Sequence, residues 1–170
     1  MDDEGAMRIR PLTAADQVML WEWLHVSLWD PPPAPPRPRE VLLAPPVRIY
    51  AEDWGRAGDL GVVGELEAEP APIGACWMRV MPPGIGLAYV DADTPQLGIS
   101  LLAPYRHQGH GRRLMQAALA AAREAGRAQV ALTVHPQNPA IALYESCGFE
   151  KVGLRNTYHL MVARLAPAAS

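Results

Sequence analysis

Apolar and polar residues alternate along this chain in patterns that predict more strands than helices. Strands are expected where apolar positions alternate with polar ones, or form short β-prone runs bounded by proline or glycine. These runs are residues 7–10, 60–66, 73–81, 96–103, 129–135, 149–152 and 157–164. Helices are expected where apolar residues recur at helical spacing or follow a capping pattern, at residues 13–29, 111–126 and 138–147. This order of elements indicates an α+β fold, and no internal repeat is visible.

The helix expected after Gly111 has the clearest amphipathic pattern. Its apolar positions are Leu114, Met115, Ala118, Leu119 and Ala122. Arginine and glutamine residues fill its opposite face, and Gly126 stands where a C-terminal cap belongs. The run before it, flanked by Pro95 and Pro104, is typical of a buried strand. A buried strand, a turn and a long helix therefore follow one another here.

Prolines dominate residues 30–46 and predict a semi-rigid loop with extended pieces, because proline is excluded from helix interiors and central strands. Residues 47–54 fit either a strand or the last turns of a short helix. Trp21, Trp23 and Trp29 lie on the preceding helix, where core packing is expected for at least two of them.

Composition and charge limit the function classes. The chain has 170 residues, 49% of them hydrophobic and 19% charged, so residues 7–166 are expected to form a single domain with flexible ends at 1–6 and 167–170. A net charge of −3 without a basic block argues against nucleic acid as the main partner. No apolar run is long enough to cross a membrane and the N-terminus is acidic, so a cytoplasmic location is expected. Cys76 and Cys147 have no disulfide or metal-type spacing and are expected to be small buried side chains.

The turn between the buried strand and the long helix carries the most informative chemistry. Its residues are Tyr105, Arg106, His107, Gln108, Gly109, His110, Gly111, Arg112 and Arg113. A helix that begins here leaves backbone N–H groups unpaired, the glycines admit an anion close to the backbone, and three arginines add positive charge. The combination predicts a phosphate or diphosphate site, while a plain strand-to-helix connection beside solvated arginines is the competing interpretation.

Two other phosphate-binding motifs are excluded. A Walker loop needs Gly-Lys-Ser/Thr, which occurs nowhere in the chain. A dinucleotide-binding fingerprint needs a third glycine where Leu114 stands and an acidic residue at the end of the next strand, where His135 stands.

Two sequence blocks resemble the GNAT superfamily of N-acetyltransferases. Arg106-x-x-Gly109-x-Gly111 resembles its Gln/Arg-x-x-Gly-x-Gly/Ala signature. The run from Asn138 to Phe149 resembles its Asn-x-x-Ala-x-x-Leu-Tyr-x-x-x-Gly-Phe block. The resemblance is strong over residues 95–153 and implies a mixed, mostly antiparallel twisted sheet with splayed central strands and flanking helices. It also implies acetyl-CoA as cosubstrate and an N-acetyltransferase activity.

The resemblance assigns roles to individual residues. Ile99 and Leu101 match the splayed strand whose free backbone groups pair with the pantetheine arm, and the N–H of Leu101 is the expected oxyanion donor. Asn138 matches a polar residue that contacts the cofactor, and Tyr144 matches the tyrosine that protonates the departing thiolate. The diphosphate is expected on the turn, at Arg106, His107, Gln108, Gly109, His110, Gly111 and Arg112.

The general base is the open point. Many relatives have a glutamate where this chain has Gln96, and an amide cannot accept a proton from the amine. His135 is the first candidate for the base, followed by Glu65 and Glu67, although a strand-end histidine paired with the backbone is the competing interpretation of His135. The turn histidines are expected to be solvated, and no metal site is expected.

Direct attack by a primary amine on acetyl-CoA in a ternary complex is therefore the leading hypothesis, because no cysteine is placed to carry the acetyl group. A non-catalytic acyl-CoA-binding sensor or regulatory module is the alternative. The acceptor, a small molecule or a peptide amine, is left open by the sequence, and so is a homodimer. The proline-rich residues 30–46 are expected to form a wall of the acceptor site.

Overall fold

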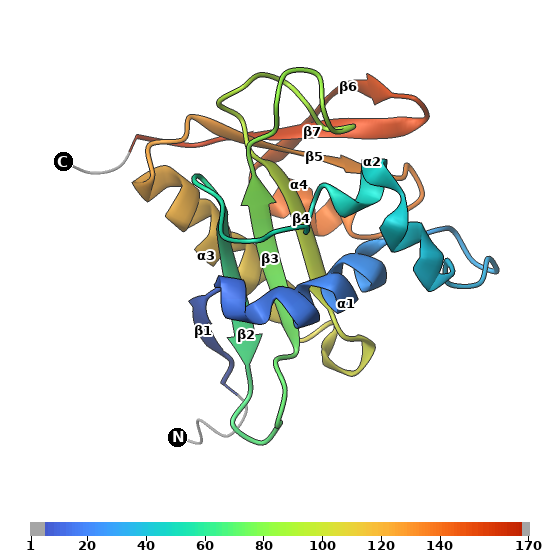
Figure 1. The fold of residues 1–170 in the computed structure, drawn as a ribbon, viewed down its shortest axis with the longest axis vertical. Helices are drawn as coiled ribbons and strands as arrows, with labels where there is room; N and C mark the ends of the chain where they lie inside the picture. The colour runs from blue at the N-terminus through green and yellow to red at the C-terminus, as the bar shows by residue number, and fades with distance from the viewer. Residues whose placement is uncertain (1–5, 168–170) are drawn as a thin grey trace.

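The computed structural model describes residues 6–167 and contains one seven-stranded sheet in the order β1-β2-β3-β4-β5-β7-β6 (Figure 1). The strands are β1 (Arg8–Pro11), β2 (Leu60–Glu65), β3 (Gly74–Arg79), β4 (Gln96–Leu101), β5 (Gln129–Val134), β6 (Phe149–Arg155) and β7 (Tyr158–Arg164). Every neighbouring pair is antiparallel except β4 and β5, which run parallel. The predicted mixed, mostly antiparallel sheet with flanking helices is confirmed.

Helices cover both faces of the sheet. They are α1 (Gln17–Ser27), α2 (Pro45–Arg48), α3 (His110–Glu124) and α4 (Ile141–Ser146), with 3₁₀ turns at Ala14–Asp16, Arg39–Leu43 and Ala103–Tyr105. In Figure 1, α1 crosses the front of β2 to β4 and α3 lies behind them. The apolar face predicted for α3 is buried in the larger core, while Leu20, Trp23 and Leu24 of α1 pack with Trp54 and Trp77 in a second core.

Several boundaries differ from those predicted. Pro11 belongs to β1, which is an edge strand, so its missing N–H interrupts no ladder. The proline-rich segment is not wholly irregular: Pro45 begins α2, at a helix start where the N–H would have no partner. The ambiguous residues 47–54 are the end of this short helix and a following turn. The predicted flexible ends fall almost wholly outside the described residues, so the domain bounds stay a prediction.

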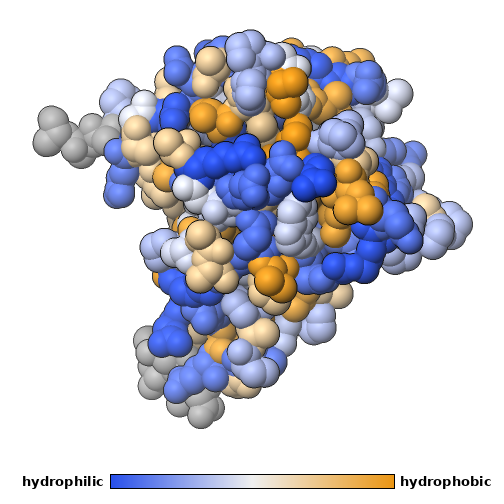
Figure 2. Space-filling view, viewed as in Figure 1, coloured by the Kyte–Doolittle hydropathy of each residue, from blue (hydrophilic) through white to orange (hydrophobic). Residues whose placement is uncertain are grey.

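The segment after α2 crosses the front of the sheet before β2 begins (Figure 1). Figure 2 shows a band of hydrophilic surface across the middle of the same view, with hydrophobic patches above it and to its right. No helix within residues 6–167 is long and apolar enough to span a membrane.

The central strands β4 and β5 separate after one paired position, Gln96 opposite Ala131. The predicted splay is therefore present. It opens the middle of the sheet on the carboxyl side of β4, where the phosphate-binding turn was expected.

Candidate active site

A cavity of about 660 Å³ opens where β4 and β5 separate. Its walls come from the end of α1, residues 37–50, the 84–88 loop, the facing parts of β4 and β5, the start of α4 and the start of β7. The predicted site residues Ile99, His135, Asn138 and Tyr144 all line it, and so does Trp29. Trp23 is fully buried and Trp21 packs against the same core, so the expectation that at least two of the three tryptophans serve packing is confirmed.

The free edge of β4 faces this cavity. The Leu102 N–H bonds the Ile73 carbonyl at 2.9 Å, so Leu102 is one of the residues whose backbone groups point towards β3. In an antiparallel ladder every second residue directs both backbone groups to the partner strand. The N–H and C=O groups of Ile99 and Leu101 therefore point away from β3, towards the gap that β5 leaves.

Arg106 ties the turn to the end of this strand. Its Nε donates to the Leu101 carbonyl at 2.9 Å, and the Gln108 side chain donates to the Pro104 carbonyl at 3.1 Å. The Leu101 carbonyl is therefore already satisfied, whereas its N–H is not. Leu101 does not line the cavity but Ile99 does, so the Ile99 N–H is the better placed of the two donors for a group inside it.

The start of α3 presents a row of unpaired amides. His107 and Gly109 adopt positive φ angles of 63° and 86°, and this left-handed geometry at alternate positions turns successive N–H groups towards one side as an anion-binding concavity. Within residues 6–167, no backbone or side-chain acceptor bonds the N–H groups of residues 107–112, and the first bond of the helix runs from Arg113 to the Gly109 carbonyl. The helix N-terminus therefore keeps its capacity to bind an anion.

The side chains of the turn divide into exposed and buried ones. Arg106, Arg112 and Arg113 are exposed, and none of the three forms an ion pair with any other described residue. His107 is exposed, as expected. His110 is not: it is 7% exposed, because the first turn of α3 packs down on the sheet. The expectation of two solvated histidines is wrong for His110.

Tyr144, on α4, lines the cavity. Its ring contacts Phe149 edge-on with 6.1 Å between centroids, which fixes its orientation. Burial raises the pKa of the Tyr144 hydroxyl well above its ordinary value, and the nearby Cys76 adds to the shift. The phenol is therefore neutral at every physiological pH and keeps a proton to donate.

His135 is held by its neighbours on the cavity wall. Its Nδ1 accepts the Gln137 N–H at 3.1 Å, and its ring meets Trp29 and Tyr158 edge-on at 5.5 and 5.7 Å between centroids. A neutral imidazole whose Nδ1 is an acceptor carries its proton on Nε2. In this arrangement His135 presents a hydrogen-bond donor at Nε2 and no free acceptor.

The other candidates for the base lie elsewhere. Glu65 is bound to Arg10 at 2.7 Å on the β1–β2 edge, Glu67 is exposed beyond the end of β2, and neither lines the cavity. Within residues 6–167 no group of three or more His, Cys, Asp or Glu side chains is arranged to hold a metal ion.

The comparisons with known proteins identify the family. The family model described as "Acetyltransferase (GNAT) family" matches residues 21–149. The chain belongs to the GNAT acetyltransferase family. A comparison with curated proteins gave no significant match.

Solved structures of GNAT proteins resemble the whole chain. The GNAT domain of S. lividans PAT is 19% identical with a TM-score of 0.68, over 96% of this chain and 93% of that one. PaiA N-acetyltransferase from Thermoplasma acidophilum, solved with coenzyme A, is 17% identical with a TM-score of 0.65, over 94% and 99%. Aminoglycoside acetyltransferase AAC(6')-Ib, solved with coenzyme A and kanamycin, is 22% identical with a TM-score of 0.61, over 94% and 95%. These similarities show the fold.

Gln96, at the position where many GNAT relatives have a glutamate, is a fully engaged structural amide. It is 1% exposed, its Oε1 accepts the Tyr50 hydroxyl at 2.7 Å, and its Nε2 donates to the Ile85 carbonyl at 2.8 Å. Gly86 packs so closely against this amide that a Cβ there would overlap it. Gln96 therefore joins β4 to two walls of the cavity, the segment after α2 and the 84–88 loop.

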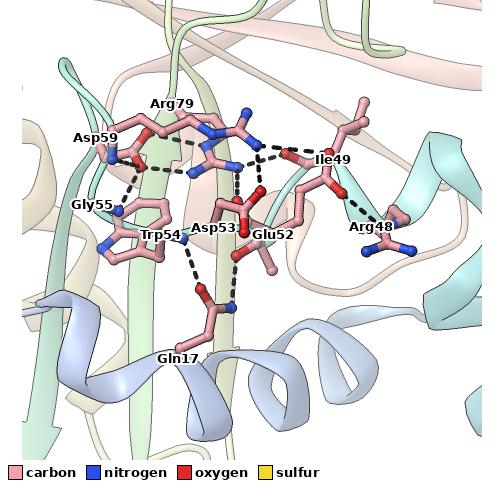
Figure 3. A network of polar contacts seen from close by, with 11 residues as sticks. Gln17, Arg48, Ile49, Glu52, Asp53, Trp54, Gly55, Asp59 and Arg79 are labelled. Atoms are coloured by element: carbon pink, nitrogen blue, oxygen red, sulfur yellow. Dashed lines mark hydrogen bonds and ion pairs between the residues drawn. The ribbon is translucent and has the colours of Figure 1, made fainter.

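A buried arginine also fixes the segment after α2, which forms one of these walls (Figure 3). Arg79 of β3 binds both carboxylate oxygens of Asp59 at 2.7 and 3.0 Å, and its guanidinium lies 5.1 Å from the centre of the Trp54 ring. Its Nη1 donates to the Ile49 and Glu52 carbonyls at 2.9 and 2.7 Å. The backbone on both sides of Tyr50 is thus fixed to the sheet.

Sequence reasoning missed these two networks. The signal for Arg79 was present, as a single charged residue within the apolar run 73–81, and such a residue needs a buried partner. Nothing in the sequence indicated that Tyr50 would meet Gln96, or that Arg37 and Tyr158 would line the same cavity.

Proposed function

We propose that the protein is an acetyl-CoA-dependent N-acetyltransferase that acts on a primary amine by direct attack in a ternary complex. One observation carries this proposal: the free edge of β4 at Ile99 and the proton-bearing Tyr144 line one cavity, and the turn that follows β4 carries the unpaired amides at the start of α3. Membership of the GNAT acetyltransferase family supports it.

The residues present fit acetyl-CoA. The N–H groups of residues 107–112 would hold the diphosphate, with the exposed arginines at positions 106, 112 and 113 around it. The free C=O of Ile99 and the free N–H of Leu101 would pair with the amides of the pantetheine arm, which leaves the Ile99 N–H for the thioester. Asn138 lines the cavity close by, but its Oδ1 already accepts the Ala140 N–H at 2.9 Å, so its amide NH₂ is the group available to the cofactor.

The chain offers groups for the acyl-transfer part of the reaction. The thioester supplies the activated acetyl group. The Ile99 N–H points into the gap where the carbonyl oxygen gains negative charge, and a fixed backbone donor stabilises that charge without reorganisation. Tyr144 is protonated and donates to the departing thiolate. Neither cysteine is placed as a nucleophile: Cys76 is buried and burial raises its pKa, and Cys147, which is only partly buried, does not line the cavity.

We propose His135 as the general base on the condition that one of its ring nitrogens becomes free to accept a proton. Its Nδ1 is occupied by the Gln137 N–H, so proton transfer from the amine requires the Nε2 proton to leave or that bond to break. His135→Asn should remove the acidic limb of the pH–rate profile if the ring accepts the proton. A lower rate with an unchanged profile would instead assign the ring to holding the acceptor.

The proposal is tested first by cofactor binding and then by turnover. Acetyl-CoA at about a hundred times its Kd should stabilise the folded protein by about 2.7 kcal/mol, read as a rise in melting temperature. Thiol release with a panel of amines measures the transfer itself. Absence of any thermal shift at millimolar acetyl-CoA would refute the proposal.

Tyr144→Phe separates catalysis from binding. The variant should lower kcat by about a hundredfold or more, the range for a lost general acid, while the Kd of acetyl-CoA changes little because the ring and its packing on Phe149 remain. Equal loss of binding and turnover would make Tyr144 a structural residue. A sensor module predicts binding without thiol release for every amine, and nothing in the described residues specifically favours it.

A further inference from the structure

The acceptor end of the cavity is lined by apolar and aromatic side chains. Leu28 and Trp29 directly follow α1, Tyr50 comes from the segment after α2, Ile85 from the loop before β4, and Tyr158 from β7. Prolines of the proline-rich segment complete this wall, as expected from the sequence. These surfaces suit the hydrocarbon or aromatic body of a ligand.

The charges around this end cancel. Arg37 lines the cavity, and its Nε and Nη2 bind both oxygens of Asp30 at 2.8 and 2.9 Å, while Nη2 also lies 3.4 Å from the Tyr158 hydroxyl. Among residues 6–167, no aspartate or glutamate lines the cavity. The other polar side chains that line the cavity carry no negative charge at neutral pH; they are the hydroxyls of Ser27, Thr133 and three tyrosines, the imidazole of His135 and the amides of Asn138 and Asn156. A second ammonium group bound here would lose its hydration without gaining a counter-charge.

We infer that the acceptor is an amine carried on an apolar or aromatic body, with no second positive charge. The reacting nitrogen needs no counter-charge from the cavity, because it attacks as the neutral amine. This inference rests on the proposed function, and it separates the chain from the neighbour solved with kanamycin, a ligand that carries several amines.

The test compares matched amines at saturating acetyl-CoA. Hexylamine and hexamethylenediamine have the same chain length and differ by one amine, and phenethylamine and kanamycin extend the comparison. We expect kcat/KM for hexylamine and phenethylamine to exceed that for the diamine by at least about tenfold, and kanamycin to give the lowest value. A diamine or kanamycin that is used as well as hexylamine would overturn the inference.

Affinity for the same amines is measured by calorimetry in parallel, so that the inference is decided even if no acetyl group moves. Binding of hexylamine with no thiol release would refute the proposed activity and support the inferred pocket. Binding of the diamine as tight as that of hexylamine would refute the inference, whatever the turnover.

One engineered charge provides the complementary test. Ile85 lines the cavity mouth and is 42% exposed, so a polar residue there should not unfold the protein. Ile85→Asp should raise the diamine-to-hexylamine ratio of kcat/KM by about tenfold, because the carboxylate supplies the missing counter-charge. Ile85→Asn, of the same size without the charge, should leave the ratio near that of the wild type. Equal ratios in both variants would contradict the charge argument.

Discussion

Replacing Gln96 with glutamate should lower the stability of the folded protein rather than supply the missing base. The amide Nε2 donates to the Ile85 carbonyl at 2.8 Å in a place that is 1% exposed. A carboxylate would put a negative oxygen against that carbonyl oxygen, and Gly86 leaves no room for it to move aside. Only the bond from the Tyr50 hydroxyl survives the change.

The magnitude follows from these contacts. An unsatisfied buried carbonyl costs about 1–3 kcal/mol, and an uncompensated buried charge brings the total for Gln96→Glu to about 3–5 kcal/mol at neutral pH. That is a large part of the free energy of unfolding of a typical domain, which is roughly 5–15 kcal/mol. Protonation removes most of the cost, since the neutral acid can donate to the Ile85 carbonyl as the amide does.

The pH dependence has a definite sign. Because the folded state disfavours the charged form, the introduced carboxyl has a folded-state pKa above its unfolded value of about 4.3. A shift of about two units corresponds to roughly 3 kcal/mol, so the variant should be close to wild-type stability below about pH 4, lose stability as the pH rises from about 4 to about 6, and stay at that lower stability above it.

Urea unfolding followed by tryptophan fluorescence at low and high pH measures this difference. Gln96→Leu is the matched control, because it removes both hydrogen bonds without adding a charge and should be destabilised equally at the two pH values. A Gln96→Glu protein as stable as the wild type at high pH, or one with faster acetyl transfer, would refute the reasoning.

Three further predictions follow from other contacts. Arg79→Met should lower the free energy of unfolding by about 3–5 kcal/mol, because Asp59 would be left buried without its partner; Arg79→Lys, which keeps the charge but not the fork, should recover part of the loss in urea unfolding. The guanidinium of Arg10 lowers the pKa of Asp16 below its unfolded value, so this pair stabilises the fold above that value and the benefit is lost as the pH falls. Asp16→Asn should therefore be destabilising at pH about 7 and cost less at pH about 3 in the same assay, because the unfolded state then already holds the proton, and an equal cost at both would refute it. Gly109→Ala strains a residue with φ of 86° and displaces the unpaired amides. Calorimetry should therefore show weaker binding of acetyl-CoA but unchanged binding of S-acetylpantetheine, which lacks the diphosphate. Equal weakening of both would place the diphosphate elsewhere.

Local sequence patterns were sufficient to predict the main helices and strands and to recognise the two motif blocks. The helical spacing from Leu114 to Ala122 predicted both α3 and its buried face, because a helix that covers a sheet must present one apolar stripe. The glycines of the turn indicated close approach of an anion to the backbone, and the structure adds that Gly109 is left-handed, a region that glycine reaches without strain. Boundaries were less accurate: α1 ends at Ser27 and α4 begins at Ile141, a few residues inside the predicted limits.

The contacts that shape the cavity are decided by tertiary structure alone. Tyr50 and Gln96 are 46 positions apart in the chain, and Arg37 and Tyr158 are 121 apart. His110 looks like a solvated turn residue in the sequence and is buried in the fold. The order of apolar and polar residues along the chain determined which segments would form strands and helices. The glycines and arginines of one turn indicated where an anion can bind. Which side chains meet across the cavity depends on how the sheet orders its strands, and local preferences carry no information about pairs so distant in the chain.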